Sequence, residues 1–471
     1  MKCKESNYIR ENKPLFKKLI AELLKTYEYA SVLVNDSTGR SYSVNKTGAN
    51  VGESSIYTSK GFVVKVYEGG CYAEYSGNEI SEVLVSEIVD MIAKDLVTMG
   101  SNKEKSHYPV PSDEAISFSK STEYKIDPLE LGDEEILKRL TEIHKKGMAA
   151  DERVLNCGAN CQFQKYSKLF LSRNKDLEQN VMWSSAAIFV DAKRGDEVKD
   201  YYTSASNLGG LEILDTIMDG VEDAAKVAIE LLDSEPIKPG TYECVCDPAT
   251  TGMIVHEAFG HGVEMDMFVK DRALAKKYVG EYVASPLVTM HDGNAVDQTA
   301  TYFFDDEGTL SNDTVVIDKG ILKSGISDLQ SAMALGTAPT GNGRRESYRR
   351  KAYTRMTNTY FEPGTDKVED MIASIKDGFL LENPFSGMED PKNWGIQLMV
   401  NIAREIKDGK LTGKIYSPIV MTGYVPDLLK SISMMSDVKV LEGGGMCGKG
   451  YKEWVKVSDG GPYIKAKIRL G

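Results

Sequence analysis

The sequence lacks the features that mark several large classes of protein. No apolar run approaches the ~20 residues that a helix needs to cross a bilayer. The first residues, MKCKESNYIRENK, are charged and polar and contain no apolar core of a signal peptide. Basic residues are not in excess: the formal net charge is −13, so the long-range attraction that supports non-specific nucleic-acid binding is missing. We therefore expect a cytoplasmic protein that binds neither membranes nor nucleic acid.

A disulfide framework and an internal repeat are also missing. The seven cysteines are an odd number scattered over 471 residues, unlike the dense and even pattern of disulfide-rich domains. No fixed-period repeat or low-complexity tract is visible, which excludes solenoids. The composition is 41% hydrophobic and 27% charged, as in ordinary globular proteins. Because the chain is too long for one ordinary core, we expect more than one domain.

Helical and strand-like patterns alternate along the chain and predict an α+β protein. Apolar residues three and four apart predict a first helix over Pro14–Ala30, and short β-like runs broken by turn residues follow it. The segment SEPIKPG then supplies two prolines and a glycine within seven residues. We predict a boundary there, with an α+β N-terminal domain over residues 1–235 and a mixed α/β C-terminal domain over 236–471.

The helix predicted after this boundary carries two histidines and a glutamate. Asp247 and Pro248 form a typical helix start, and His256, Glu257 and His261 follow. Two imidazoles and a carboxylate are the ingredients of a zinc hydrolase. The C-terminal domain is therefore the one expected to carry a metal site. A chance pair is the alternative interpretation, although the chain has only five histidines.

The spacing of the two histidines demands an irregular helix. Residues five apart diverge by roughly 140° in a regular α-helix, so His256 and His261 would not share one ion. A π-type turn with i→i+5 bonding would bring them back together. Gly260 and Gly262 flank His261 and allow the helix to loosen there. The sequence therefore predicts a π-type turn at this point.

Other side chains could complete such a site. A catalytic zinc needs a third protein ligand, and Cys447 lies in the glycine-rich stretch LEGGGMCGKG. An incidental cysteine in a turn is the alternative. Glu264 and Asp266 could accept the free N–H of a metal-bound imidazole, or they could form an exposed acidic turn.

Several motifs together resemble the TldD/PmbA family of metallopeptidases. They are the HEAFGHG segment with Glu264 and Asp266, the glycine-rich loop around Cys447, Asp305-Asp306-Glu307-Gly308, GNGRRESY from Gly341 to Tyr348, and RMTN from Arg355 to Asn358. The resemblance implies a TldD-like catalytic subunit that holds one zinc ion through His256, His261 and Cys447, with Glu257 as general base. It also implies a dimer, either with itself or with a metal-free sister subunit, in which the N-terminal domain serves dimerisation and substrate enclosure.

The function expected from this resemblance is zinc-dependent hydrolysis of short or unfolded peptides. Zinc would activate a water molecule, and Glu257 would take its proton. Arg344, Tyr348 and Asn358 are candidate substrate-binding residues, although a solvated loop would also explain the basic run GRRESYRRKAYTR. The competing hypotheses are a zinc amidase or deacylase acting on a non-peptide amide, and a non-catalytic scaffold or regulatory subunit.

Overall fold

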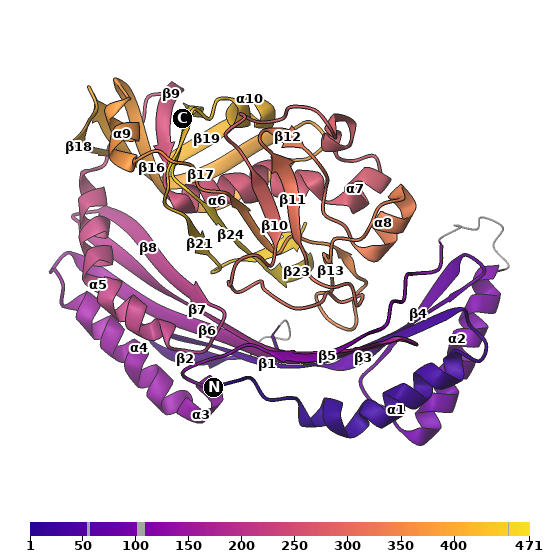
Figure 1. Cartoon of the computed structure of the whole chain (residues 1–471). Helices are drawn as coiled ribbons and strands as arrows, with labels where there is room; N and C mark the ends of the chain where they lie inside the picture. Colours follow the sequence, from indigo (N-terminus) through magenta and orange to yellow (C-terminus); the bar gives the residue numbers. More distant parts are fainter. Residues whose placement is uncertain (54–56, 101–108, 451) are drawn as a thin grey trace.

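The computed structural model describes residues 1–53, 57–100, 109–450 and 452–471, and it combines helices with several β-sheets (Figure 1). The predicted α+β fold class is therefore confirmed. In the described part of the chain, no helix is both long enough and apolar enough to span a membrane.

An eight-stranded sheet dominates the N-terminal half. Its strands run in the order β4-β3-β1-β6-β7-β5, with β2 paired to β1 and β8 paired to β7. The sheet is strongly curved, and its concave side faces the C-terminal half of the chain (Figure 1). Its strands are β1 (Tyr29–Asn45), β2 (Gly48–Gly52), β3 (Ser59–Glu68), β4 (Cys71–Gly77), β5 (Ile116–Ser121), β6 (Val154–Leu171), β7 (Lys175–Arg194) and β8 (Glu197–Asn207).

Helices cover the convex side of this sheet (Figure 1). They bury two apolar clusters against it, one under α1 and α2 and the other under α4 and α5. Burial of such apolar stripes is what holds amphipathic helices on a sheet. The helices are α1 (Asn7–Leu23), α2 (Glu82–Gly100), α3 (Pro128–Leu131), α4 (Asp133–Met148) and α5 (Ile213–Glu230).

The predicted bounds of the first helix are wrong. Helix α1 begins at Asn7 because the hydroxyl of Ser6 accepts a hydrogen bond from the Ile9 amide and caps it. Pro14 lies inside the helix, not at its start, and removes one backbone hydrogen bond. The buried stripe of Ile9, Phe16, Leu19, Ile20 and Leu23 outweighs that loss.

The C-terminal half contains two larger sheets with both parallel and antiparallel pairs. A seven-stranded sheet has the order β16-β9-β25-β19-β17-β18, with β20 paired to β25, and an additional β16–β17 pairing. A six-stranded sheet has the order β12-β11-β10-β15-β24-β21. The strands are β9 (Gly240–Cys246), β10 (Met290–Gly293), β11 (Asp313–Asp318), β12 (Ile321–Leu322), β15 (Asn358–Phe361), β16 (Asp377–Asp390), β17 (Gly395–Lys407), β18 (Lys410–Tyr416), β19 (Ile419–Tyr424), β20 (Met434–Met435), β21 (Val440–Glu442), β24 (Ser458–Gly461) and β25 (Ile464–Leu470).

Short elements complete this half. Two separate hairpins are β13 (Gly343–Arg344) with β14 (Tyr353–Thr354), and β22 (Met446–Lys449) with β23 (Lys452–Lys456). The helices are α6 (Pro248–Ile254), α7 (Met265–Val269), α8 (Leu329–Leu335), α9 (Val368–Ala373) and α10 (Val425–Lys430). The strands of the first sheet end at Asn207 and those of the other sheets begin at Gly240. The division into domains 1–235 and 236–471 remains a prediction.

Helix α6 positions the candidate site. It begins where the Asp247 carboxylate accepts a hydrogen bond of 2.7 Å from the Thr250 amide. The helix packs against β16 and β24, and most of its side chains are buried. Its C-terminal end is therefore held rigidly between the two sheets.

Candidate active site

The end of α6 changes from α-helical to π-helical geometry. Residues 255–260 form a π-helical turn, and the His261 amide donates a hydrogen bond to the His256 carbonyl, five residues earlier. The predicted π-type turn is confirmed. At Gly260, an added Cβ would lie only 2.1 Å from the Met356 sulfur, so any larger residue would force the buried Met356 side chain to move.

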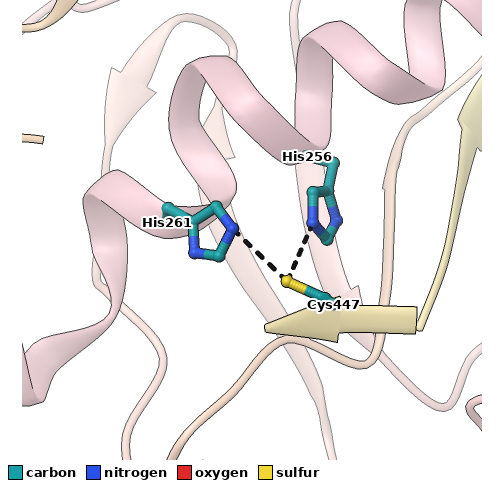
Figure 2. Close-up of side chains that lie close together, drawn as sticks. All are labelled: His256, His261 and Cys447. Carbon is teal, nitrogen blue, oxygen red and sulfur yellow. Dashed lines mark hydrogen bonds between the residues drawn. The ribbon is translucent and has the colours of Figure 1, made fainter. Parts of the chain in front are cut away.

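This turn brings the two imidazoles to one sulfur atom. His256 Nε2 and His261 Nε2 each lie 3.3 Å from Cys447 Sγ, and the three atoms fall within 4.8 Å of one another (Figure 2). The imidazole planes are nearly perpendicular, at 83°. Cys447 comes from hairpin β22–β23, almost 200 residues away in sequence, so the site exists only in the folded chain.

Electrostatics favour the ligand form of the thiol. Burial alone would raise the pKa of Cys447, but the two histidines hold it well below its usual range. Burial would lower the pKa of His261, yet the thiolate and Glu264 raise it. The three groups thus form a tightly interacting set that favours the thiolate form of the sulfur.

The donor set and its spacing fit a zinc ion. Two imidazole nitrogens and a thiolate are typical zinc ligands, and three protein ligands leave one position open. Tetrahedral coordination with Zn–S about 2.3 Å and Zn–N about 2.0 Å separates sulfur from nitrogen by about 3.5 Å. The observed 3.3 Å differs from this by only a few tenths of an ångström.

Glu264 and Asp266 are buried, not exposed in an acidic turn. Glu264 is 1% exposed, and its Oε2 lies 3.4 Å from His261 Nδ1, so it faces the outer side of that imidazole. Burial would raise the pKa of Glu264, but Lys449, His261 and Arg355 hold it well below its ordinary value. Asp266 is 5% exposed and is bound instead by Lys449 at 2.7 Å and Lys270 at 3.1 Å.

Arg355, like Lys449, is a site residue whose role was not predicted from the sequence. Its side chain is fully buried and donates to Cys447 Sγ at 2.8 Å, to Glu264 Oε1 at 3.2 Å and to the Glu453 carbonyl. It therefore joins the thiolate to the carboxylate that faces His261. The RMTN motif was the only signal in the sequence, and an arginine within a basic run resembles a solvated residue.

Glu257 lies half-buried on the π-helical turn beside His256. Gly387 of β16 packs against it so closely that a Cβ there would lie 2.5 Å from Glu257 Cγ. Ala249, Met253 and Glu257 are spaced by four residues and share roughly one side of the helix. Ala249 and Met253 line a cavity of about 1000 Å³ between the first sheet and the C-terminal half.

The three candidate substrate-binding residues have different environments. Arg344 and Tyr348 line a smaller pocket, also between the first sheet and the C-terminal half. Asn358 is fully buried, and its side chain is bonded to the Gly293 carbonyl and to the hydroxyls of Thr301 and Ser458. These hydrogen bonds are all made inside the protein, and the prediction that Asn358 binds substrate stays a prediction.

Comparison with known proteins identifies the family of this chain. Residues 239–469 match the PmbA/TldA metallopeptidase C-terminal domain. The metalloprotease TldD homolog of Haemophilus influenzae is 30% identical over 353 residues, which cover 72% of each chain. The chain belongs to the TldD/PmbA family. A zinc metalloprotease TldD homolog from Saccharolobus solfataricus is 28% identical over 313 residues, covering 65% of this chain and 69% of that protein.

The extent of similarity varies among these proteins. Across the curated relatives compared, the matches cover from 50% to 97% of the relative's own length. TldE from Thermococcus kodakarensis has the same fold, with a TM-score of 0.76 over 97% of this TldD/PmbA chain and 100% of its own, at 18% identity. At that identity the structural likeness concerns the fold alone.

Proposed function

We propose that this protein is a zinc-dependent peptidase that hydrolyses short or unfolded peptides in the cytoplasm. The observation that carries the proposal is the convergence of His256 Nε2, His261 Nε2 and Cys447 Sγ within 4.8 Å. The names of the relatives, metalloprotease and zinc metalloprotease, support the same chemistry. A thiolate ligand favours zinc over harder divalent ions such as Mg²⁺ or Mn²⁺.

The metal would be held by the two imidazoles and the thiolate. When bound, zinc supplies a Lewis acid that polarises the scissile carbonyl and makes water more acidic. Glu264 orients His261 from its outer side, and Arg355 holds both Glu264 and Cys447 in place. These contacts fix the ligand geometry before the metal arrives.

Glu257 would act as the general base of the reaction. Its position beside His256 suits a base that accepts the proton of the attacking water and passes it to the leaving amine. The close packing of Gly387 limits the positions open to its side chain. The cavity of about 1000 Å³ beside the helix offers room for several residues of an extended peptide.

A dimer would enclose this cavity. We propose pairing either with a second copy or with a metal-free sister subunit, with the N-terminal domain at the contact, and the fold shared with TldE is compatible with a related subunit as the partner.

The proposal is tested by replacing Glu257 with glutamine. We expect Glu257→Gln to keep its zinc and to lose about 10²–10⁴-fold in kcat on a peptide mixture, because the proton acceptor is gone. Elemental analysis and peptide digestion are the measurements, with Glu369→Gln on the surface of α9 as a control that keeps full activity. Activity within a few-fold of wild type in Glu257→Gln would remove this residue from the mechanism.

A further inference from the structure

Two pockets lie side by side between the first sheet and the C-terminal half. The large cavity is the one of about 1000 Å³, and the other, here called the basic pocket, has room for about 90 Å³. Along strand β1, Asn35 and Ser37 line the basic pocket, whereas Ser41 and Ser43 line the large cavity. The neighbouring strands β6 and β7 also line the basic pocket with one part of their length and the large cavity with another. Both pockets therefore belong to one cleft that follows these strands.

The glycine loop before Cys447 separates the two pockets. Gly444 and Gly445 line the large cavity, whereas Met446, the next residue, lines the basic pocket. A Cβ at Gly445 would meet nothing within 4 Å, so the space beside the loop is open. Because neighbouring side chains of a strand point to opposite faces, Met446 faces the basic pocket and Cys447 faces the histidines. A peptide that crosses this loop would pass next to the metal ligands.

The basic pocket carries two cations without a counter-charge. Arg344 donates to the Met356 carbonyl at 2.6 Å, and Lys456 donates to the Gly444 carbonyl at 3.0 Å and lies 4.4 Å from the centre of the Trp183 ring. Neither forms an ion pair with any carboxylate in the described residues, although Lys456 is only 6% exposed. Burying a charge without an opposite charge is costly, so an anion in this pocket would be stabilising.

The other charged groups of this pocket have hydrogen-bond or ion-pair partners within the protein. Lys168 pairs with Asp306, and Arg345 pairs with Glu74 at 2.7 Å. The remaining acids are Asp305 and Glu346; Asp305 accepts three backbone N–H groups, and Glu346 accepts the Glu453 amide. Burial raises the pKa of Asp305 to about 8, and burial lowers the pKa of Lys456 to about 7. A carboxylate beside Lys456 would restore its full charge.

The large cavity has the opposite character. Asp200, Glu442 and Asp459 line it, against the single lysine Lys199. The side chain of Asp459 forms neither a hydrogen bond nor an ion pair with the other described residues, and burial raises its pKa to about 6. The cleft thus has acidic side chains at one end and basic side chains at the other, which suits a peptide whose N-terminus lies in the large cavity and whose C-terminal carboxylate lies in the basic pocket.

We propose that the basic pocket binds the C-terminal carboxylate of the peptide substrate, so that the enzyme removes residues from the C-terminal end. This inference rests on the proposed peptidase function. Arg344 offers the planar donors that carboxylates prefer. Met446 lines this pocket and the next residue, Cys447, faces the histidines on the other side of β22, so a peptide that crosses the glycine loop would connect the pocket with the metal ligands.

Pairs of peptides that differ only at the C-terminus provide the test. We expect wild-type kcat/KM to be about tenfold or more higher for the free acid than for the C-terminal amide, because the amide lacks the charge. Arg344→Gln and Lys456→Met should each bring this ratio toward one, mainly through the KM of the acid. Arg350→Gln, an exposed change in the same loop, should keep the wild-type ratio. A third peptide, an amide with a glutamate side chain at its last position, distinguishes a terminal carboxylate from a side-chain carboxylate.

Binding without turnover separates the two proposals. In Glu257→Gln protein, calorimetry should show the acid binding about tenfold or more tightly than the amide. Cleavage of acid and amide with equal kcat/KM would overturn the carboxylate subsite and leave the peptidase proposal intact. Acid-selective binding with no cleavage of any peptide by wild type would overturn the peptidase proposal and leave the subsite intact. Melting curves of both pocket variants confirm that a lost preference does not reflect misfolding.

Discussion

At the scale of single residues, the site depends on an arginine that touches no substrate. Arg355 is fully buried and connects Cys447 Sγ, Glu264 and the Glu453 carbonyl through three donor groups. A lysine has the charge but not the planar fork, and therefore cannot make these three contacts at once.

Arg355→Lys is expected to weaken zinc binding by about 10–100-fold, as loss of an outer-shell contact usually does. Titration of zinc against a competing chelator measures this directly. Arg355→Met should be worse, because it leaves Glu264 buried with fewer cations and destabilises the fold by roughly 3–5 kcal/mol. Unchanged zinc affinity in Arg355→Lys would contradict the positioning role.

The ligand candidates could be named from the sequence because their residue types are rare and chemically specific. Metal binding and acid–base catalysis need imidazole, carboxylate and thiol groups, and these groups occur close to glycines at His256, Glu257, His261 and Cys447. Arg355 and Lys449 could not be named, because a basic residue in a polar segment gives no sign that the fold will bury it. The burial of Asn358 could not be predicted for the same reason: nothing in RMTN indicates that its amide is bonded within the fold.

At the scale of elements, the π-helical turn decides whether the two histidines meet. The five-residue spacing alone predicted this turn, because a regular helix would have separated the imidazoles. Its stability depends on Gly260, where the helix touches the Met356 side chain. Helix ends were harder to predict. Helix α1 begins seven residues earlier than expected, because the serine cap and the buried apolar stripe stabilise it by more than Pro14 destabilises it.

Gly260→Ala is expected to disturb this turn. The added methyl would press on the buried Met356 sulfur, destabilising the fold by about 1–3 kcal/mol and lowering zinc content. Gly220→Ala in helix α5 is a matched control, since a Cβ there meets nothing within 4 Å and should stabilise the protein by about 0.5–1 kcal/mol. Urea unfolding and metal analysis of both variants test the difference. Equal behaviour of the two would mean that the tight contact has no structural consequence.

At the scale of the whole molecule, buried ion pairs join the first sheet to the C-terminal half. Glu74 of β4 pairs with Arg345, Lys65 of β3 pairs with Glu307, and Lys168 of β6 pairs with Asp306. The basic run containing Arg345 was compatible with a solvated loop when read as sequence. Pairing over 138 to 271 residues cannot be deduced from local pattern, so the closure of the two halves around the cleft could not be predicted.

Glu74→Gln should destabilise the protein by roughly 3–5 kcal/mol near pH 7, because it leaves the buried Arg345 unpaired. Burial raises the pKa of Glu74, but Arg345 and Lys65 hold it below its ordinary value. The pair therefore contributes fully above the unfolded-state pKa of about 4.3 and is lost as pH falls through the folded-state value. The difference between variant and wild type in urea unfolding should shrink from pH 7 to pH 4. The exposed Glu79→Gln is the control, and a pH-independent difference would contradict the ion-pair account.

The central claim is that His256, His261 and Cys447 hold one zinc ion. Its most direct test is the metal content of purified wild-type protein beside Cys447→Ala, both measured by elemental analysis after dialysis. We predict about one zinc per wild-type chain and much less in the variant, since a thiolate is one of only three protein ligands. Equal zinc in both proteins, or a wild type that binds no zinc even when it is supplied, would contradict the account.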